Sequence, residues 1–403
     1  MRVVHVNLRL AVAVAGLAMA APAHAAPVPE TAPVSAHAMV HSCCTPAAEK
    51  ERIFEDAERL GAAYIRVDVE LTGDWTGLDQ VARLSRRHRL PVLGILVTAP
   101  DFTDADEFGR LAGEAAARAA GTVGHWQVMN EPDGGGTFHG TPEQYARMLS
   151  AAHDAIETRA PDARVVFGGL QDPRPTTWLR RVLATPGADA LHKFDIAAIH
   201  LRGPVERVVR RYREFSAWIA KRGFTGPVWV TELGYPADPA FQTDPAFRGG
   251  ADSQAAYLTQ SLVGLGEAGA PQVFVTLRDN PELLPRAVSE GVVGRPAFAA
   301  LRRVVDDWGQ LMAWRADQRE HERLAGLDLA AARASAAEAR AARARGQTAA
   351  GRGERAGAFR AGAEVAALWH TVVARRQRRS AFLHGVAAEL FKREIAWKPP
   401  GGG

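Results

Sequence analysis

The chain has 403 residues, of which 47% are hydrophobic and 23% charged, so it can bury the core of one large domain or two ordinary ones. Its formal net charge is +4, but this charge is unevenly distributed. Residues 311–403 carry 17 Lys and Arg against 9 Asp and Glu, a net charge of +8, which leaves −4 for the rest of the chain. The basic character therefore belongs to the C-terminal part alone, and it does not indicate nucleic-acid binding.

The first residues have the layout of a secretory signal peptide. A short basic region leads into an apolar stretch that ends in Ala23-His24-Ala25, a small-residue cleavage pattern. The stretch is too short to span a membrane comfortably, although an uncleaved anchor is the alternative. We expect residues 1–25 to be removed on export and residues 26–36 to form a Pro/Ala-rich linker.

Cys43 and Cys44 are the two cysteines of the chain, and they are adjacent. Neighbouring cysteines cannot staple distant parts of a fold, so a disulfide framework is excluded. In an exported protein they form either a vicinal disulfide or a pair of buried thiols. No Cys-x-x-Cys or histidine cluster accompanies them, so the sequence predicts neither a metal site nor a cofactor.

Short apolar runs alternate with helical stretches along most of the chain. The expected strands are residues 37–42, 63–68, 91–97, 123–129, 165–169, 194–200, 228–232 and 272–277. These runs are continuously apolar, which is typical of parallel strands covered by helices. Eight such units in about 270 residues predict a (β/α)8 TIM barrel over residues 37–310. A doubly wound open sheet is the alternative, but no Gly-x-Gly-x-x-Gly or Walker loop supports a nucleotide-binding version.

The composition changes after about residue 310. The Ala/Arg-rich extension over residues 311–403 has few large apolar side chains, so we expect an exposed helix or partial disorder. Its last part is more amphipathic and carries a basic cluster at residues 375–379. A solvated helix accounts for this cluster, and weak contact with an acidic polymer or a membrane surface is the alternative.

Polar side chains stand at the C-terminal ends of the expected strands. The C-terminal strand ends of a (β/α)8 barrel converge on one face, where active sites are built. The residues at these ends are Arg66 and Asp68, Asn130 and Glu131, His200, Glu232, and Arg278-Asp279-Asn280. This placement brings two carboxylates, Glu131 and Glu232, to opposite sides of the barrel mouth.

A pair of carboxylates suits the hydrolysis of a glycosidic bond. One group must be protonated to donate to the leaving oxygen, and the other must be ionised to attack or to activate water. We expect burial to raise the pKa of Glu131 and Arg66 to keep Glu232 charged. A separation of about 5–5.5 Å between the carboxyl groups would indicate retention, and about 6.5–9.5 Å would indicate inversion.

Four further residues are candidates for substrate binding. Asn130 can hydrogen-bond a sugar hydroxyl, and His200 can position either a carboxylate or the sugar. Trp126 and Tyr235 can stack on sugar faces. The structural alternatives are a satisfied core histidine at His200 and ordinary core packing at Trp126.

Two motifs carry a family resemblance. The Asn-Glu-Pro of residues 130–132 and the Thr-Glu-Leu-Gly-Tyr-Pro of residues 231–236 resemble the catalytic signatures of clan A retaining glycoside hydrolases. The cellulase-like family 5 and the xylosidase-like family 39 are the most similar groups, over about residues 35–305. The resemblance implies that Glu131 is the general acid/base and Glu232 the nucleophile, with Arg66, Asn130 and His200 as supporting residues. The family often places a Trp on strand eight, whereas this strand contains Phe274 and no Trp.

The sequence therefore predicts an exported retaining glycoside hydrolase that cleaves β-glycosidic bonds of a poly- or oligosaccharide. The first alternative is a carbohydrate-binding barrel without turnover. The second is a surface-attached interaction protein that acts through its basic tail. In each case the expected partner is a saccharide or an acidic surface, and not a nucleic acid.

Overall fold

The computed structural model describes residues 27–174, 176–279, 289–349, 371–374, 377–378 and 381–382. The expected signal peptide, residues 1–25, lies outside the described residues. No helix within the described ranges is long and apolar enough to cross a membrane.

The strands form one parallel sheet in the order β5-β4-β3-β2-β1-β8-β7-β6. They are β1 (Val34–His41), β2 (Ile65–Glu70), β3 (Val92–Val97), β4 (Val123–Val128), β5 (Arg164–Val166), β6 (Ala197–Leu201), β7 (Val228–Leu233) and β8 (Val273–Thr276). Isolated bridges from Val166 to Ile196 and from Leu170 to Ile199 connect the β5 side to β6. The sheet is therefore a nearly closed barrel, which confirms the predicted fold and excludes the open sheet.

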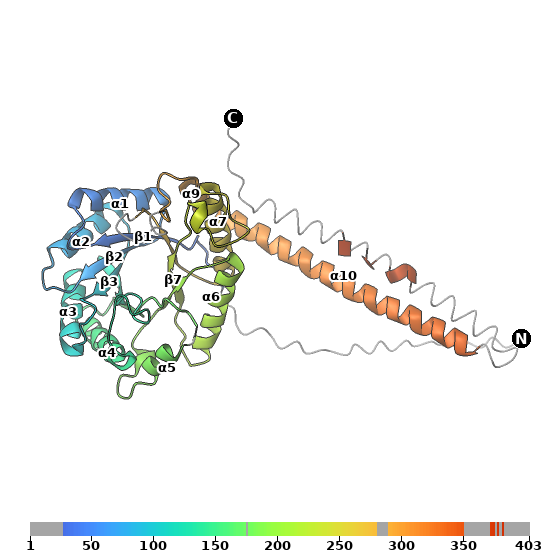
Figure 1. Ribbon diagram of the computed structural model, residues 1–403, viewed down its shortest axis with the longest axis horizontal. Coiled ribbons are helices and arrows are strands. Elements are labelled where there is room, and N and C mark those ends of the chain that lie inside the picture. The colour runs from blue at the N-terminus through green and yellow to red at the C-terminus, as the bar shows by residue number, and fades with distance from the viewer. Residues whose placement is uncertain are drawn as a thin grey trace, which may run out of the picture.

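Helices surround the barrel as an outer ring (Figure 1). They are α1 (Ala47–Leu60), α2 (Thr76–His88), α3 (Ala105–Arg118), α4 (Pro142–Arg159), α5 (Thr177–Leu183), α6 (Val205–Ala220), α7 (Ala251–Glu267) and α9 (Pro296–Asp306), with 3-10 turns η1 (Ala190–His192) and η2 (Pro239–Phe241). Local sequence fixes where several of them begin. The Thr141 hydroxyl accepts a hydrogen bond from the Gln144 amide, the Gln144 side chain accepts one from the Thr141 amide, and Pro142 fills the first turn of α4.

The apolar side chains form two layers because the side chains of a strand alternate between its two faces. The inner layer fills the barrel and consists of Leu93, Val166, Ile196, Ala198, Trp229 and Phe274. The larger outer layer lies between the sheet and the helices. A filled interior closes the lower part of the barrel, so polar chemistry is confined to the C-terminal strand ends.

The expected linker extends too far into the fold. Strand β1 begins at Val34, and both Val34 and Ala36 are fully buried. Val34 pairs with Val273 of β8, a partner far away in the sequence, so local composition could not reveal this part of the strand.

The C-terminal extension begins as a structural part of the barrel. Helix α10 (Trp308–Ala349) extends away from the barrel (Figure 1). Its first turns pack on α7: the Trp308 ring lies against Gly266, and Arg315 forms an ion pair with Glu267. The expected boundary at residue 310 therefore falls inside a packed helix. The basic cluster at residues 375–379 lies largely outside the described residues.

Cys43 and Cys44 form a vicinal disulfide in the loop after β1, where both residues are exposed. The Glu70 carboxylate accepts hydrogen bonds from the Ser42 hydroxyl (2.7 Å) and the Cys43 amide (3.0 Å). The disulfide loop is thus attached to the C-terminal end of β2, at the same face of the barrel as the candidate residues.

Candidate active site

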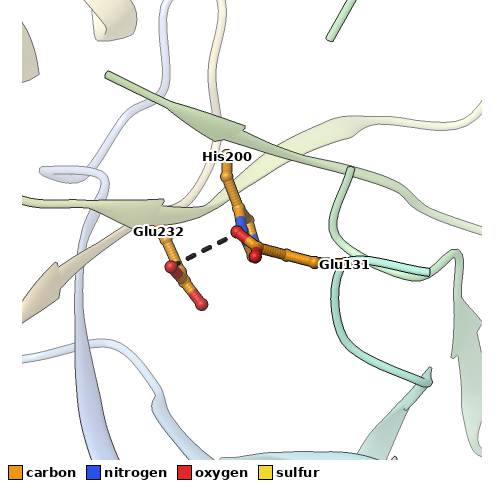
Figure 2. A group of neighbouring side chains, drawn as sticks. All are labelled: Glu131, His200 and Glu232. Atoms are coloured by element: carbon orange, nitrogen blue, oxygen red, sulfur yellow. Dashed lines mark hydrogen bonds and ion pairs between the residues drawn. The ribbon is translucent and has the colours of Figure 1, made fainter. Parts of the chain in front are cut away.

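Five of the predicted residues come together at the C-terminal end of the barrel. Figure 2 shows Glu131, His200 and Glu232 pointing toward one another from the end of β4, from β6 and from β7. Arg66 of β2 and Asn130 complete the group. The barrel thus brings residues that are more than 160 positions apart in the sequence into one cluster.

The backbone at the end of β4 leaves the extended conformation to present Glu131. Met129 and Glu131 have φ angles of 61° and 42°, in the left-handed region that non-glycine residues seldom adopt. The Glu131 amide donates to the Gly169 carbonyl at 3.0 Å, which fixes this turn against the chain that follows β5. Such backbone strain is concentrated at functional sites, where the surrounding structure enforces it.

Two guanidinium groups hold Glu232, whose side chain is 12% exposed. Arg66 donates to its Oε1 at 2.8 Å and Arg202 to its Oε2 at 3.2 Å. Burial by itself would raise the pKa of Glu232, but the electrostatic interactions with His200, His37, Arg66 and Arg202 hold it well below the usual value. Glu232 is therefore an ionised carboxylate at neutral pH.

Arg66 is a buried fork with three partners. Besides Glu232, it donates to His37 Nδ1 at 3.0 Å and to Asn130 Oδ1. Burial lowers the pKa of His37 to about 3, and the Arg66 charge adds to this effect. A neutral His37 that accepts at Nδ1 carries its proton on Nε2, which lies 3.7 Å from Glu232 Oε1. The uncharged imidazole thus adds a proton donor beside the carboxylate.

Glu131 has a different environment, with histidine and amide contacts in place of arginines. Its Oε1 lies 2.6 Å from His200 Nδ1, and Gln171 donates to its Oε2 at 3.3 Å. The side chain is 24% exposed, twice the exposure of Glu232. His200 Nδ1 also lies 3.5 Å from Glu232 Oε2, so one imidazole nitrogen contacts both carboxylates. One carboxylate oxygen of Glu131 lies within 4.8 Å of one carboxylate oxygen of Glu232.

The same three side chains could also hold a metal ion. Glu131, His200 and Glu232 each offer one ligand atom within this 4.8 Å cluster. However, Arg66 and Arg202 already contact the two oxygens of Glu232, and both guanidinium groups would repel a cation. The donor set therefore fits proton and group transfer better than metal binding.

Two of the predicted sugar-stacking residues lie away from the cluster. Trp126 is fully buried in the outer layer, where its ring lies against Gly94, because it occupies the outward-facing position of β4. Tyr235 is 2% exposed, stacks on Tyr257 with ring centroids 3.8 Å apart, and donates to the Phe247 carbonyl at 3.0 Å. Neither ring can face a sugar, and Tyr235 instead fixes the loop after β7.

Strand β8 presents no aromatic ring to the mouth. Phe274, its aromatic residue, is fully buried in the inner layer, 6.0 Å from the ring of Trp229. A residue one layer below the mouth cannot replace a stacking platform. The departure of this strand from the family pattern is therefore also a difference in the shape of the site.

Several residues of the cluster escaped the sequence prediction. His37 could have been found, because it faces inward on β1 and pairs in register with Arg66. Arg202 lies two residues after His200, beyond the end of its strand. Asp68 was identified only as one of the polar residues at the strand ends, yet burial raises its pKa to about 6 despite the opposing charge of Arg66. Glu290 stands in no motif and could not have been found.

Comparisons with known proteins support the assignment of the fold. No family model and no curated protein matches the chain. A glucosidase from Croceicoccus marinus matches with a TM-score of 0.56 at 14% identity, over 70% of this chain and 68% of that one. An exo-β-1,4-mannosidase from Opitutaceae bacterium strain TAV5 has a TM-score of 0.49 at 18% identity, and the match spans 69% of this chain and 60% of the mannosidase. The predicted resemblance is thus confirmed at the level of the fold: the chain has a glycoside hydrolase-like (β/α)8 barrel.

Proposed function

We propose that the protein is a retaining glycoside hydrolase in which Glu232 is the nucleophile and Glu131 the general acid/base. One observation carries the proposal: the two glutamates at the ends of β4 and β7 have oxygens within 4.8 Å of each other, and only Glu232 is held by two arginines. This distance between single oxygens is compatible with the separation of about 5–5.5 Å between carboxyl groups that accompanies retention.

The asymmetry of the two environments assigns the two roles. Glu232 is kept ionised, as a nucleophile must be, and its Oε2 faces the Glu131 side of the site. Glu131 is contacted instead by His200 and Gln171, and its side chain is twice as exposed as that of Glu232. This setting suits a group that must donate and take up a proton.

The reaction has two steps. In the first, a Glu232 oxygen bonds to the anomeric carbon while the glycosidic C–O bond breaks and Glu131 donates its proton to the leaving oxygen. In the second, Glu131 takes a proton from water, the water oxygen bonds to the anomeric carbon, and the bond to Glu232 breaks. The enzyme returns to its starting protonation, and the product keeps the configuration of the substrate.

Asn130 is a substrate-binding residue in this proposal. Its Oδ1 accepts from Arg66, so the Nδ2 group is oriented as a donor. It is half-buried beside Glu131 and can donate to a sugar hydroxyl near the scissile bond. The substrate we propose is a β-linked poly- or oligosaccharide, and the N-terminal signal-peptide layout supports export to an extracytoplasmic location.

Release of reducing sugar from a panel of β-linked polysaccharides and aryl β-glycosides tests this proposal. The mature wild type is compared with Glu232→Gln, Glu131→Gln and the surface control Glu143→Gln, whose side chain pairs with Arg181 on the outer helices. We expect the control to match the wild type and Glu232→Gln to lose about a thousandfold or more, because the attacking group is gone.

The stereochemistry of the product separates the mechanisms. Proton NMR of the first product formed should show the β anomer before mutarotation. Release of the α anomer would contradict retention, and full activity in Glu232→Gln would remove this residue from the mechanism. Saccharide binding without turnover in the wild type would support the carbohydrate-binding alternative.

A further inference from the structure

A third carboxylate, Glu290, lies beside the proposed catalytic pair. It follows β8 in the chain, and its side chain is 7% exposed. Its Oε2 lies 3.8 Å from the Arg202 nitrogen that also donates to Glu232 Oε2 at 3.2 Å. Arg202 is thus shared between two glutamates from different loops, while its own side chain remains 44% exposed at the mouth.

The loop after β7 makes room for this carboxylate. A Cβ atom at Gly234 would lie 2.1 Å from Glu290 Oε2. Gly234 is not among the residues with positive φ, so the backbone itself does not require glycine there. The absence of a side chain at Gly234 therefore serves the close approach of Glu290, two residues after Glu232.

A buried amide fixes the segment that carries Glu290. Gln254 of α7 is fully buried, and its Nε2 lies within hydrogen-bond distance of the carbonyls of Tyr235 (2.9 Å), Ser289 (3.2 Å) and Glu290 (3.1 Å). One side chain thereby ties the loop after β7 to the segment after β8. The position of Glu290 is built into the fold.

The charge around Glu232 changes during a retaining reaction. Its charged and titratable neighbours are His37 from β1, Arg66 and Asp68 from β2, Glu131 after β4, His200 and Arg202 from β6 and its loop, and Glu290 after β8. When Glu232 becomes an ester of the sugar, it loses the negative charge that balances Arg202. The transition state also places positive charge on the sugar ring, which an unbalanced guanidinium would oppose.

We propose that Glu290 is a positioning residue that balances the charge of Arg202 throughout the reaction, so that Arg202 can hold Glu232 without opposing the sugar cation. This inference rests on the proposed glycosidase function. It assigns a role to a carboxylate that no sequence motif marks, and it gives Gly234 a reason to be glycine.

The test measures kcat, KM and the pH profile of kcat/KM for Glu290→Gln, Arg202→Met and the double variant. We expect Glu290→Gln to lower kcat about tenfold or more with little change in KM, because the charge acts on the transition state. The acidic limb of the kcat/KM profile of Glu290→Gln should move to lower pH, because the charge of Arg202 then stabilises the ionised form of Glu232 alone. Arg202→Met should move the limb to higher pH, and the double variant should recover part of the kcat that Glu290→Gln loses.

Two further variants separate positioning from loop stability. Asp279→Asn is the matched control, because the Asp279 carboxylate accepts from the Gly291 amide at 2.8 Å in the same segment. It should lower the melting temperature and leave the acidic limb in place. Gly234→Ala should reproduce the kcat loss of Glu290→Gln. If Glu290→Gln behaves like Asp279→Asn, the inference is overturned.

An inactive wild type would refute the proposed function and not this contact. In that case ¹³C NMR of carboxyl-labelled glutamate, assigned with Glu232→Gln, reports the titration of Glu232 directly. The pKa of Glu232 should rise in Arg202→Met and fall in Glu290→Gln. Unchanged titration in both variants would overturn the shared role of Arg202.

Discussion

At the scale of single residues, charge rather than position distinguishes the two central glutamates. Both stand at strand ends, yet Glu232 has two arginines and Glu131 has His200 and Gln171. The arginines keep Glu232 ionised, which supports the proposed roles of Glu232 as nucleophile and Glu131 as acid/base.

His37 makes the stability of the fold depend on pH. Burial lowers its pKa from 6.5 to about 3, so the folded chain leaves it neutral where the unfolded chain protonates it. The unfolded state therefore binds more protons between pH 6.5 and about 3, and this contribution destabilises the fold as the pH falls through that window. Well above pH 6.5 the imidazole is neutral in both states and contributes nothing to the slope.

We predict that His37→Gln loses less stability on acidification than the wild type. Glutamine can still accept from Arg66 but cannot take up the proton. Urea unfolding midpoints at pH 7 and pH 4.5 measure the difference, and His192→Gln, on an exposed histidine, is the matched control. An equal drop in wild type and His37→Gln would contradict the assignment of this pH dependence to His37.

At the scale of elements, close packing between strand ends aligns the site. The chain after β5 approaches β6 so closely that a Cβ atom at Gly169 would lie 2.2 Å from His200 Nε2 and 2.8 Å from Thr231 Oγ1. Gly169 also accepts the hydrogen bond that holds the Glu131 amide. Gly169 is thus in contact with both His200 and Glu131.

We predict that Gly169→Ala displaces His200 from Glu131. The added methyl group should destabilise the fold by about 1–3 kcal/mol through overpacking and lower kcat/KM by about tenfold or more. Gly124→Ala is the control, because a Cβ at Gly124 of β4 meets no atom within 4 Å. Thermal unfolding and steady-state kinetics of both variants test this prediction. Wild-type kinetics in Gly169→Ala would show that the contact between His200 and Glu131 is dispensable.

At the scale of the whole molecule, α10 is both part of the barrel and an arm beyond it. Trp308 donates from its indole nitrogen to the Pro29 carbonyl at 2.9 Å, and Arg315 and Arg319 both pair with Glu267 of α7. The start of α10 therefore connects the segment before β1 to α7.

We predict different outcomes for two truncations. A chain ending at residue 326 keeps the packed turns, so its melting temperature should stay within about 3 °C of the full chain and its activity should be unchanged. A chain ending at residue 307 loses the buried Trp308 and should melt at least about 6 °C lower. Loss of function on truncation at residue 326 would instead favour the interaction-protein alternative.

The prediction from sequence succeeded where a property is local. Apolar runs located all eight strands, because strand patterning depends on nearby residues. The strand ends then placed Arg66 and Glu232 on one face. Their catalytic roles stay predictions until the variants are measured.

The sequence predictions that failed have two causes. Side chains alternate between the two faces of a strand, and distant segments of the chain come into contact. Trp126 lies one residue from an inward-facing position, and Tyr235 is drawn into a loop anchor by partners after β7. Glu290 reaches Arg202 from beyond β8, through a gap left at Gly234.

Short-range sequence patterns are sufficient to predict the order of the elements, the barrel, and the pair of glutamates at strand ends. The groups that surround each glutamate depend on the tertiary fold. The low pKa of Glu232, the neutral His37 and the sharing of Arg202 between two carboxylates all arise from burial and from charges on different strands. Electrostatic interactions depend on distance in space and on solvent exclusion, and neither quantity can be read along the chain.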